Sequence, residues 1–491
     1  MERIVRSQGV NRSEEILAAL CDKAFLPLWC YPNLHRQVAK ELADVVVVFG
    51  DDVILFEDKA RQFPDTGKLD VDWRRWHRKS IDRSVEQLMR AERCLRQQPT
   101  EVYLDAKCTK RFPFPINPNG RFHKVVVARH AKDRCIKEVG RSGSLMIHGP
   151  TVPCPTEPPP FEIFLSQYDD FVHLLDEVSL PLVLGELDTA TDFIDYLAKK
   201  EAAFKSGQLM ASFGEEETLA VFLTSVLVRL RADEARAFPE TSEGPIIVGP
   251  GHWAELTERS EYRDKKRADQ ISYLWDTILK AFGDGVHQGD APNPSNAPLE
   301  RLEAIGRRLA SETRFRRREL CVALVAAQQN AQPGHALNRT CLSRRRPDVA
   351  YVFCLIPQLE ESYEEYRSNR RIYSSLYGVH TLGRANRISE AVVIATDMGH
   401  ATEVSFDFGM VRRDELNEEA ERRADEFARE RGWATDICNL NWFGHSIREF
   451  PRISQRISQR RESAARQARK LHVKKVRKTE RSARKAGRGR R

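Results

Sequence analysis

Apolar and polar positions near the N-terminus follow first a helical and then an extended pattern. Apolar side chains recur at helical spacing over Arg12–Lys23, and a second, short helix is predicted over His35–Ala43. Two continuous apolar runs follow, Val45–Phe49 and Val53–Phe56, separated only by Gly50-Asp51-Asp52. Gly and Asp between apolar runs are typical of a tight β-turn. The pattern therefore predicts the order helix, strand, turn, strand.

Further elements complete a predicted α/β unit. A long helix is predicted from Trp73 to Gln97, because apolar residues recur along one of its faces. Strands are predicted at Glu101–Asp105 and at Val125–Ala128. We expect these elements to form one compact domain over residues 1–150.

The rest of the chain divides into three parts. A Pro-rich stretch from Pro150 to Pro160 is typical of a linker. Residues 161–330 are predicted to be mainly helical, and residues 331–435 to form a second, smaller α/β region. The predicted elements of these two regions are helices at Asp188–Ala203, Glu215–Ala232, Ala268–Phe282 and Asp414–Arg431 and strands at Val349–Ile356 and Ala391–Thr396. The chain ends in a basic tail, residues 451–491.

Positive charge is concentrated in this tail. The formal net charge of the chain is +8. Residues 451–491 contain 17 Lys and Arg but only two acidic residues, Glu462 and Glu480. Such a tail typically adds salt-sensitive affinity for phosphates, independent of sequence. We therefore expect a nucleic-acid partner, and a solvated tail without a specific partner is the alternative.

The composition predicts a soluble, cytoplasmic protein. No stretch approaches the roughly 20 consecutive apolar residues that cross a bilayer, and residues 1–8 lack the apolar run of a secretion signal. The ten cysteines form no Cys-x-x-Cys pair, and no Cys and His residues have the spacing of a structural zinc site. Reduced thiols are expected.

Charged residues flank the predicted hairpin. Asp44 precedes its first strand, and Glu57-Asp58-Lys59 follows its second apolar run. A two-residue loop is either Gly50-Asp51 or Asp51-Asp52. The first loop places Asp44 opposite Glu57, and the second places it opposite Lys59. In both registers the three side chains share one face, with opposed or diagonal pairs roughly 4.5–8 Å apart.

These residue types suit phosphodiester hydrolysis. Asp44 and Glu57 offer hard oxygen ligands to Mg²⁺ or Mn²⁺. Lys59 can orient or activate the attacking water and offset charge in the transition state. Glu41, at the end of the predicted short helix, can ligate the ion through a water or hold a second ion. An ordinary buried hairpin is the alternative, which we disfavour because charges beside a buried sheet are costly unless they serve a site.

The same residues resemble the PD-(D/E)xK nuclease superfamily, whose signature is an acid at a strand start followed by acid-x-Lys on the next strand. Glu57-Asp58-Lys59 matches the second element as written, whereas Ala43-Asp44 replaces the Pro-Asp of the first, a departure that the superfamily often tolerates. The resemblance covers about residues 20–110 and implies a restriction-endonuclease-like mixed sheet flanked by helices. It also implies that Glu41 serves as the helix-borne acid of some members. Gln87, in line with Ser80 and Ser84 on the long helix, is similar to a polar residue that assists the site in some branches.

Two other segments match acid-x-Lys. Asp264-Lys265-Lys266 lies in a charged helical run without a partner acid. Asp105-Ala106-Lys107 is the stronger rival, because it ends a predicted strand in the same domain.

Two further features have both a functional and a structural interpretation. The basic side of the long helix carries Trp73 and Trp76, which either stack on bases or belong to the core. Asp188, Asp192 and Asp195 share one side of a helix and either bind a cation or form a capped, solvated face, which we favour.

The sequence thus predicts a divalent-metal-dependent nuclease that hydrolyses nucleic-acid phosphodiesters, with DNA as the expected substrate and bacterial defence or repair as the expected setting. The alternative is a catalytically inactive nuclease fold that binds nucleic acid or regulates a partner. Homo-oligomerisation through the regions beyond residue 150 is left open.

Overall fold

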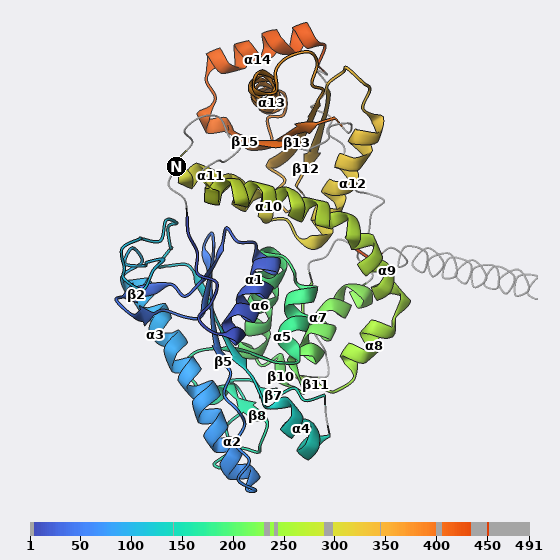
Figure 1. Ribbon diagram of the computed structural model, residues 1–491. Coiled ribbons are helices and arrows are strands. Elements are labelled where there is room, and N and C mark those ends of the chain that lie inside the picture. The colour runs from blue at the N-terminus through green and yellow to red at the C-terminus, as the bar shows by residue number, and fades with distance from the viewer. Residues whose placement is uncertain are drawn as a thin grey trace, which may run out of the picture.

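The computed structural model describes residues 4–140, 142–229, 236–239, 244–288, 298–343, 345–398, 405–433 and 449–450. Within these residues the chain is a mixed α/β protein with four sheets. Figure 1 shows two of the larger sheets in a lower body and the third in an upper body, with the helices α10 (Tyr273–Gln288) and α11 (Leu299–Ala310) between them.

The first sheet contains the hairpin that carries the candidate site. Its strand order is β1-β4-β5-β6-β9, in which β1, β4 and β5 pair antiparallel and β5, β6 and β9 pair parallel. The strands are β1 (Cys30–Pro32), β4 (Val45–Phe49), β5 (Asp52–Lys59), β6 (Arg121–Ala128) and β9 (His173–Asp176). The three strands predicted over residues 45–49, 53–56 and 125–128 are confirmed. Because β9 completes the sheet, the expected domain limit at residue 150 falls before its last strand.

Helices cover both faces of this sheet. On one face lies a long helix, formed by α2 (Leu69–His77), a π-helical turn over Arg78–Asp82, and α3 (Arg83–Gln97), which packs on β5 and β6. On the other face, Phe56 of β5 contacts Phe25 of α1 (Arg12–Phe25) and Phe193 of α6 (Ala190–Lys205). The helices predicted at Arg12 and Trp73 are therefore confirmed, the second with an inserted π-turn.

Two predictions in this region are wrong. The segment predicted as a helix over His35–Ala43 is the small hairpin β2 (His35–Gln37) and β3 (Lys40–Glu41). It turns at Ala39, whose φ is 55°, and His35 exchanges backbone hydrogen bonds with Tyr103. The strand predicted at Glu101–Asp105 is reduced to isolated bridges of Tyr103. Contacts between distant segments thus override the local helical preference.

A second sheet, of order β11-β10-β7-β8, also lies in the lower body, and a third, of order β12-β13-β14-β15, lies in the upper body.

The predicted strands at Val349 and Ala391 are confirmed as β13 and β14, and the helix predicted at Ala268–Phe282 is broken at residues 270–272. The strands are β7 (Met146–His148), β8 (Glu162–Phe164), β10 (Leu209–Ser212), β11 (Ile246–Val248), β12 (Leu337–Leu342), β13 (Val349–Ile356), β14 (Glu390–Asp397) and β15 (Phe406–Arg412). The remaining helices are α4 (Lys132–Val139), α5 (Ser179–Glu186), α7 (Glu215–Arg229), α8 (His252–Glu258), α9 (Ser260–Asp269), α12 (Arg314–Asn330), α13 (Tyr363–Arg384) and α14 (Glu418–Arg431).

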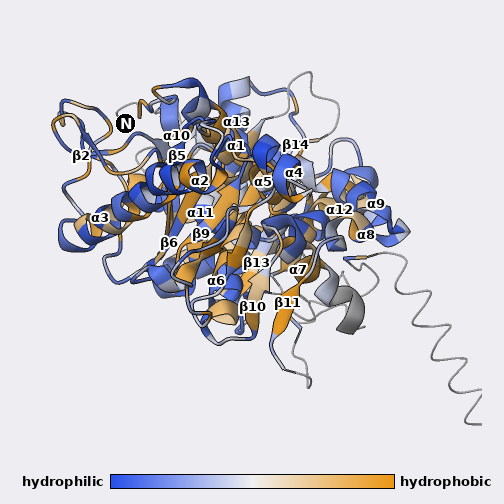
Figure 2. Cartoon of the chain, turned by 90° about the horizontal axis from the view of Figure 1, so that it is seen from below, coloured by the Kyte–Doolittle hydropathy of each residue, from blue (hydrophilic) through white to orange (hydrophobic). Residues whose placement is uncertain are grey.

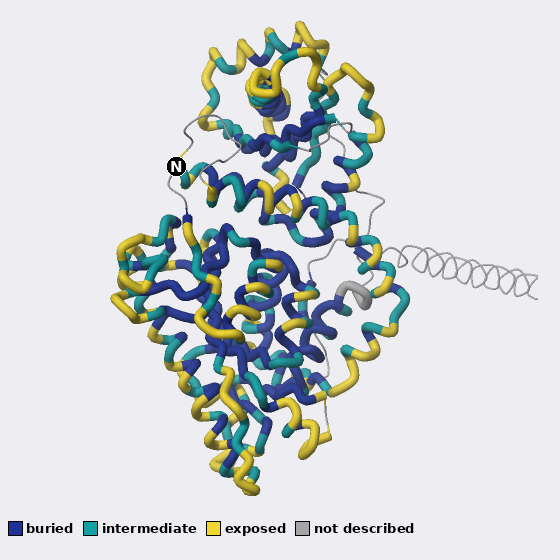
Figure 3. Tube along the Cα trace, in the orientation of Figure 1, coloured by how far each residue is buried: buried dark blue, intermediate teal, exposed yellow. Residues whose placement is uncertain are grey.

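One hydrophobic core joins the two bodies. Trp275 of α10 packs edge-on against Tyr351 of β13, and Phe282 of the same helix packs against Phe408 of β15. Figures 2 and 3 show apolar, buried strands inside and polar, exposed surfaces on the outer helices. No helix in the described part of the chain is both long enough and apolar enough to span a membrane.

Candidate active site

The β4–β5 hairpin sets the geometry of the candidate site. The strands pair from Val45 opposite Phe56 to Phe49 opposite Asp52, so the loop is Gly50-Asp51. Gly50 adopts a φ of 64°, a conformation that glycine reaches without steric cost. This is the first of the two expected registers. Extended by one residue, it places Asp44 opposite Glu57, with Lys59 two residues further on the same face.

The two carboxylates of this face are buried. The exposed fraction is 3% for Asp44 and 0% for Glu57. The backbone N–H of Asp58 donates to Asp44 Oδ2 at 2.6 Å, which ties the start of β4 to the end of β5. The middle residue of the motif, Asp58, points to the opposite face and binds the Arg129 guanidinium through both carboxylate oxygens.

Glu57 is the unusual member. Its Oε1 pairs with Lys59 Nζ, whereas its Oε2 accepts no hydrogen bond from any described residue. A buried carboxylate with unused lone pairs is costly, because it has lost water without gaining full replacement. Hard oxygen ligands of this kind fit Mg²⁺ or Mn²⁺.

The pKa values of the site show how closely these charges are coupled. Burial, together with the charge of Glu57, raises the pKa of Asp44 to about 8. Burial also raises the pKa of Glu57 to about 7, although Lys59 lowers it. Burial alone lowers the pKa of Lys59, but the charges of Glu57 and Asp44 raise it above its ordinary value. At neutral pH Lys59 is therefore an ammonium, and the two carboxylates hold a proton that a cation would displace.

Two more acids stand beside this pair. Glu41 lies on β3 and not on a helix, which corrects its predicted position. Glu14, in the first turn of α1 and 7% exposed, was not predicted. Asn33 Nδ2 donates to Glu14 Oε2 at 3.2 Å and to Glu41 Oε1 at 3.3 Å, and Asn33 N donates to the Asp44 carbonyl at 3.0 Å.

Glu14 is the acid that a helix presents to the site. Its charge raises the pKa of both Asp44 and Glu57. In the sequence it is indistinguishable from an ordinary acidic residue in a first helical turn, where carboxylates are favoured. The helical placement implied for Glu41 is therefore wrong, and Glu14 occupies such a position, while the role of Glu41 in the site stays a prediction.

The acids do not converge on a single point. Among the described residues, no third carboxylate joins Asp44 and Glu57 in a group whose ligand atoms all lie within 4.8 Å of one another. Glu14 and Glu41 can therefore reach an ion held by Asp44 and Glu57 only through water or after a side-chain movement. Mg²⁺ commonly keeps several waters and takes one or two carboxylates.

Gln87 is half-buried on α3, which packs on β5. In the described structure it makes no hydrogen bond to Asp44, Glu57 or Lys59, so its predicted assistance to the site stays a prediction.

The rival motif has a structural role. The carboxylate of Asp105 accepts hydrogen bonds from the backbone N–H groups of Lys107, Thr109 and Lys110 and so closes an exposed loop. No strand of the described residues places a second acid opposite it.

The other candidates of the sequence also serve the fold. Asp188 binds Arg314 Nε at 2.8 Å, and Asp192 binds Arg236 at 3.2 Å, so these acids pair with arginines. Trp73 and Trp76 are buried and stack on each other, which confirms the core interpretation. The basic tail lies outside the described residues.

A groove runs beside the long helix. It has a volume of about 690 Å³, and Tyr168 lies in its wall. Three arginines on one side of the helix line it, namely Arg78, Arg90 and Arg93. Three acids, Asp82, Glu86 and Asp169, also line the groove, so it has no net positive charge. Its arginines and its aromatic ring are the features that can contact nucleic acid.

No family model, curated protein or solved structure matches this chain.

Proposed function

We propose that this protein is a divalent-metal-dependent nuclease that hydrolyses phosphodiester bonds of nucleic acid, with DNA as its substrate. The observation that carries the proposal is the buried pair Asp44 and Glu57 beside Lys59, in which Glu57 Oε1 pairs with Lys59 Nζ and Glu57 Oε2 has no hydrogen-bond donor among the described residues. The mixed first sheet with helices on both faces supports a restriction-endonuclease-like fold for this part of the chain.

Each residue has a distinct role in this proposal. Asp44 and Glu57 hold Mg²⁺ or Mn²⁺, and Glu14 and Glu41 add negative charge around the ion. The bound ion supplies Lewis-acid polarisation of the scissile phosphate. Because its pKa is raised, Lys59 stays protonated, so it orients the attacking water and offsets developing charge and does not accept a proton.

The groove beside α3 provides a path for the substrate. Arg78, Arg90 and Arg93 would pair with backbone phosphates, which fixes the position of a strand but reads no sequence. The basic tail would add affinity of the same kind.

A cleavage assay tests the proposal. Purified full-length protein is incubated with single-stranded DNA, duplex DNA and RNA, with Mg²⁺, with Mn²⁺ or with EDTA. We expect DNA to be cleaved with either ion and to stay intact with EDTA. Equal cleavage by wild type and by both Asp44→Ala and Lys59→Ala would contradict the proposal.

Two observations favour the alternative of a non-catalytic nucleic-acid-binding protein. Glu57 has an exposed fraction of 0%, and a third acid does not converge with it and Asp44. This alternative predicts salt-sensitive DNA binding that EDTA leaves unchanged, with no cleavage of any of the three substrates.

A further inference from the structure

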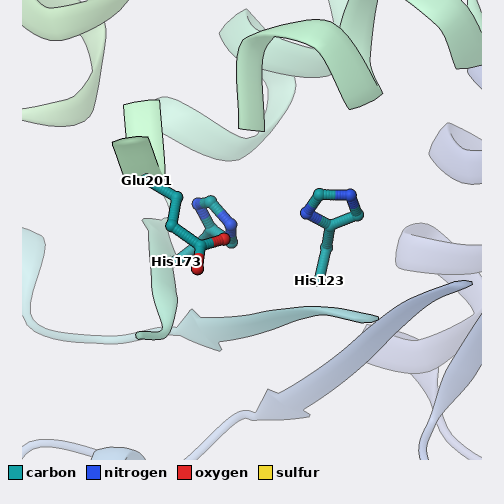
Figure 4. A group of neighbouring side chains, drawn as sticks. All are labelled: His123, His173 and Glu201. Carbon is teal, nitrogen blue, oxygen red and sulfur yellow. The ribbon is translucent and has the colours of Figure 1, made fainter. Parts of the chain in front are cut away.

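A second cluster of ligand-type side chains lies at the same sheet, on the face opposite the candidate active site. It consists of His123 of β6, His173 of β9 and Glu201 of α6, and the ligand atoms of the three residues all lie within 4.8 Å of one another. Figure 4 shows the two imidazole rings with Glu201 beside them, and one ring nitrogen of His123 directed toward the other two side chains.

The parallel pairing of β6 and β9 creates the cluster. Val125 pairs with His173, and His123 precedes Val125 by two residues on the same face. This face is also the face of Phe56, which α6 covers. Helix α6 therefore brings Glu201 over the two histidines.

The histidines are not ordinary core residues with satisfied hydrogen bonds. His173 has an exposed fraction of 1%, and neither of its ring nitrogens has a hydrogen-bond partner among the described residues. His123 is 3% exposed, and its Nδ1 is likewise buried without a partner.

The other nitrogen of His123 is already oriented. Its Nε2 lies 3.3 Å from Asp52 Oδ1, so a proton on Nε2 is shared with a carboxylate while Nδ1 faces the cluster. Histidines that bind metals usually donate their second ring N–H to such a carboxylate or carbonyl.

Two of the lysines near the cluster are paired with acids outside it, and a third contacts Glu201 itself. Lys200 pairs with Glu215, and Lys124 pairs with Glu92 and with Asp170 at 2.9 Å. Lys205 contacts Glu201 Oε1 at 2.6 Å, but about half of the Lys205 side chain is exposed, so the ammonium can withdraw into water.

We propose that His123, His173 and Glu201 bind Zn²⁺, with a fourth position left to water. Two imidazole nitrogens and one carboxylate are a common donor set for zinc, whereas Mg²⁺ prefers oxygen ligands. The ion would link β6, β9 and α6. Because it joins three elements that are distant in sequence, it stabilises the fold, since the unfolded chain has no preformed site.

This site is separate from the candidate active site. His123 of β6 lies opposite Ile54 of β5. Ile54 precedes Glu57 by three residues, so His123 and Glu57 are separated by roughly 10 Å along the strand direction. The side chains of Glu57 and His123 also point to opposite faces of the sheet. Zinc binding therefore neither requires nor implies nuclease activity.

Metal binding can be measured without any activity assay. The full-length protein is stripped with a chelator and titrated with Co²⁺, and separately with Zn²⁺, in excess Mg²⁺ so that the oxygen-rich site is occupied. We expect one equivalent of Zn²⁺ per chain, a visible absorption band of four-coordinate Co²⁺, and a higher melting temperature with Zn²⁺ than without it.

Variants locate the ion. His123→Asn, His173→Asn and Glu201→Gln should each weaken binding by more than about tenfold, while His252→Asn, an exposed histidine, and Asp44→Asn should bind as the wild type does. Circular dichroism shows whether each variant is folded.

Glu201 is only half-buried on α6, so Glu201→Gln tests the site even where a histidine variant does not fold. The proposal is overturned if the wild type takes up no stoichiometric Zn²⁺, or if folded Glu201→Gln binds it with unchanged affinity.

Discussion

Asp44 and Glu57 share one buried face with Lys59, and each changes the ionisation of the others. The sequence predicts that these three side chains share a face, because side chains alternate along a strand and either loop register keeps the three residues together. It cannot predict that Glu14 belongs to the site, because Glu14 lies on a helix about 30 positions before Asp44 and contacts the site through a hydrogen bond from Asn33. Nor can it show that Glu57 Oε2 lacks a hydrogen-bond donor among the described residues, because that depends on every neighbour in the folded chain.

The raised pKa of Asp44 predicts a pH-dependent cost to stability. In the unfolded chain this carboxyl titrates near its ordinary value of about 4, whereas in the folded protein it titrates at about 8. Protonated Asp44 therefore makes its full contribution to the free energy of unfolding below pH 4, and this contribution is lost as the pH rises through about 8.

Asp44→Asn should remove this loss. In metal-free buffer at alkaline pH, we expect the melting temperature of the variant to exceed that of the wild type by about 1–3 °C, with the difference vanishing in acid. Thermal unfolding followed by circular dichroism measures it. The exposed Asp70→Asn is the control and should show no such pH dependence; a variant that is less stable at alkaline pH would refute the prediction.

Protons and metal should compete at the same carboxylates. Since the pKa values of Glu57 and Asp44 are raised to about 7 and about 8, the apparent affinity for Mg²⁺ should increase as the pH rises through this range. The cleavage rate is measured as a function of pH at two Mg²⁺ concentrations. The pH at which the rate begins to rise should be lower at the higher Mg²⁺ concentration. A profile that does not move with Mg²⁺ concentration would show that these groups do not hold the ion.

At the scale of elements, the strands of the hairpin are predictable because a buried strand is a continuous apolar run between turn residues. The hairpin at residues 35–41 is not predictable, because Tyr103 fixes it through backbone hydrogen bonds from about 65 positions away. The cluster of His123, His173 and Glu201 cannot be predicted from the sequence for a similar reason. His123 and His173 have no local spacing that indicates a metal site, and only the parallel pairing of β6 with β9 brings them together.

The groove beside α3 predicts which arginines hold nucleic acid. Arg90→Ala and Arg93→Ala should each weaken DNA binding by about threefold or more and reduce the salt dependence by about one phosphate contact. Arg75→Ala is the matched control, because Arg75 is exposed on α2 and does not line the groove. Fluorescence anisotropy over a range of salt concentrations measures both effects. Equal losses in all three variants would exclude the groove as the specific path.

For the whole molecule, a single core joins the first sheet to the upper sheet through α10. The sequence indicates the mixed α/β composition of both regions, because each has its own apolar runs. It does not indicate that they share one core, since that depends on aromatic contacts between segments far apart in the chain.

The charge of the whole chain predicts a second contribution to binding. Deletion of residues 451–491 should weaken binding to DNA of any sequence and lower its salt dependence, because 17 Lys and Arg are removed. Under saturating DNA, the cleavage rate of the truncated protein should stay close to that of the full chain. A loss of cleavage at saturation would place the tail in the active site.

The central claim, that Lys59 acts within a metal-dependent active site, is tested most directly by comparing two lysines of acid-x-Lys segments. Single-turnover cleavage of DNA is measured with Mg²⁺ for Lys59→Ala and for Lys107→Ala. We expect Lys59→Ala to reduce the rate by about 10²-fold or more, and Lys107→Ala, in the exposed loop closed by Asp105, to leave it unchanged. Equal rates for the two variants and the wild type would contradict the account.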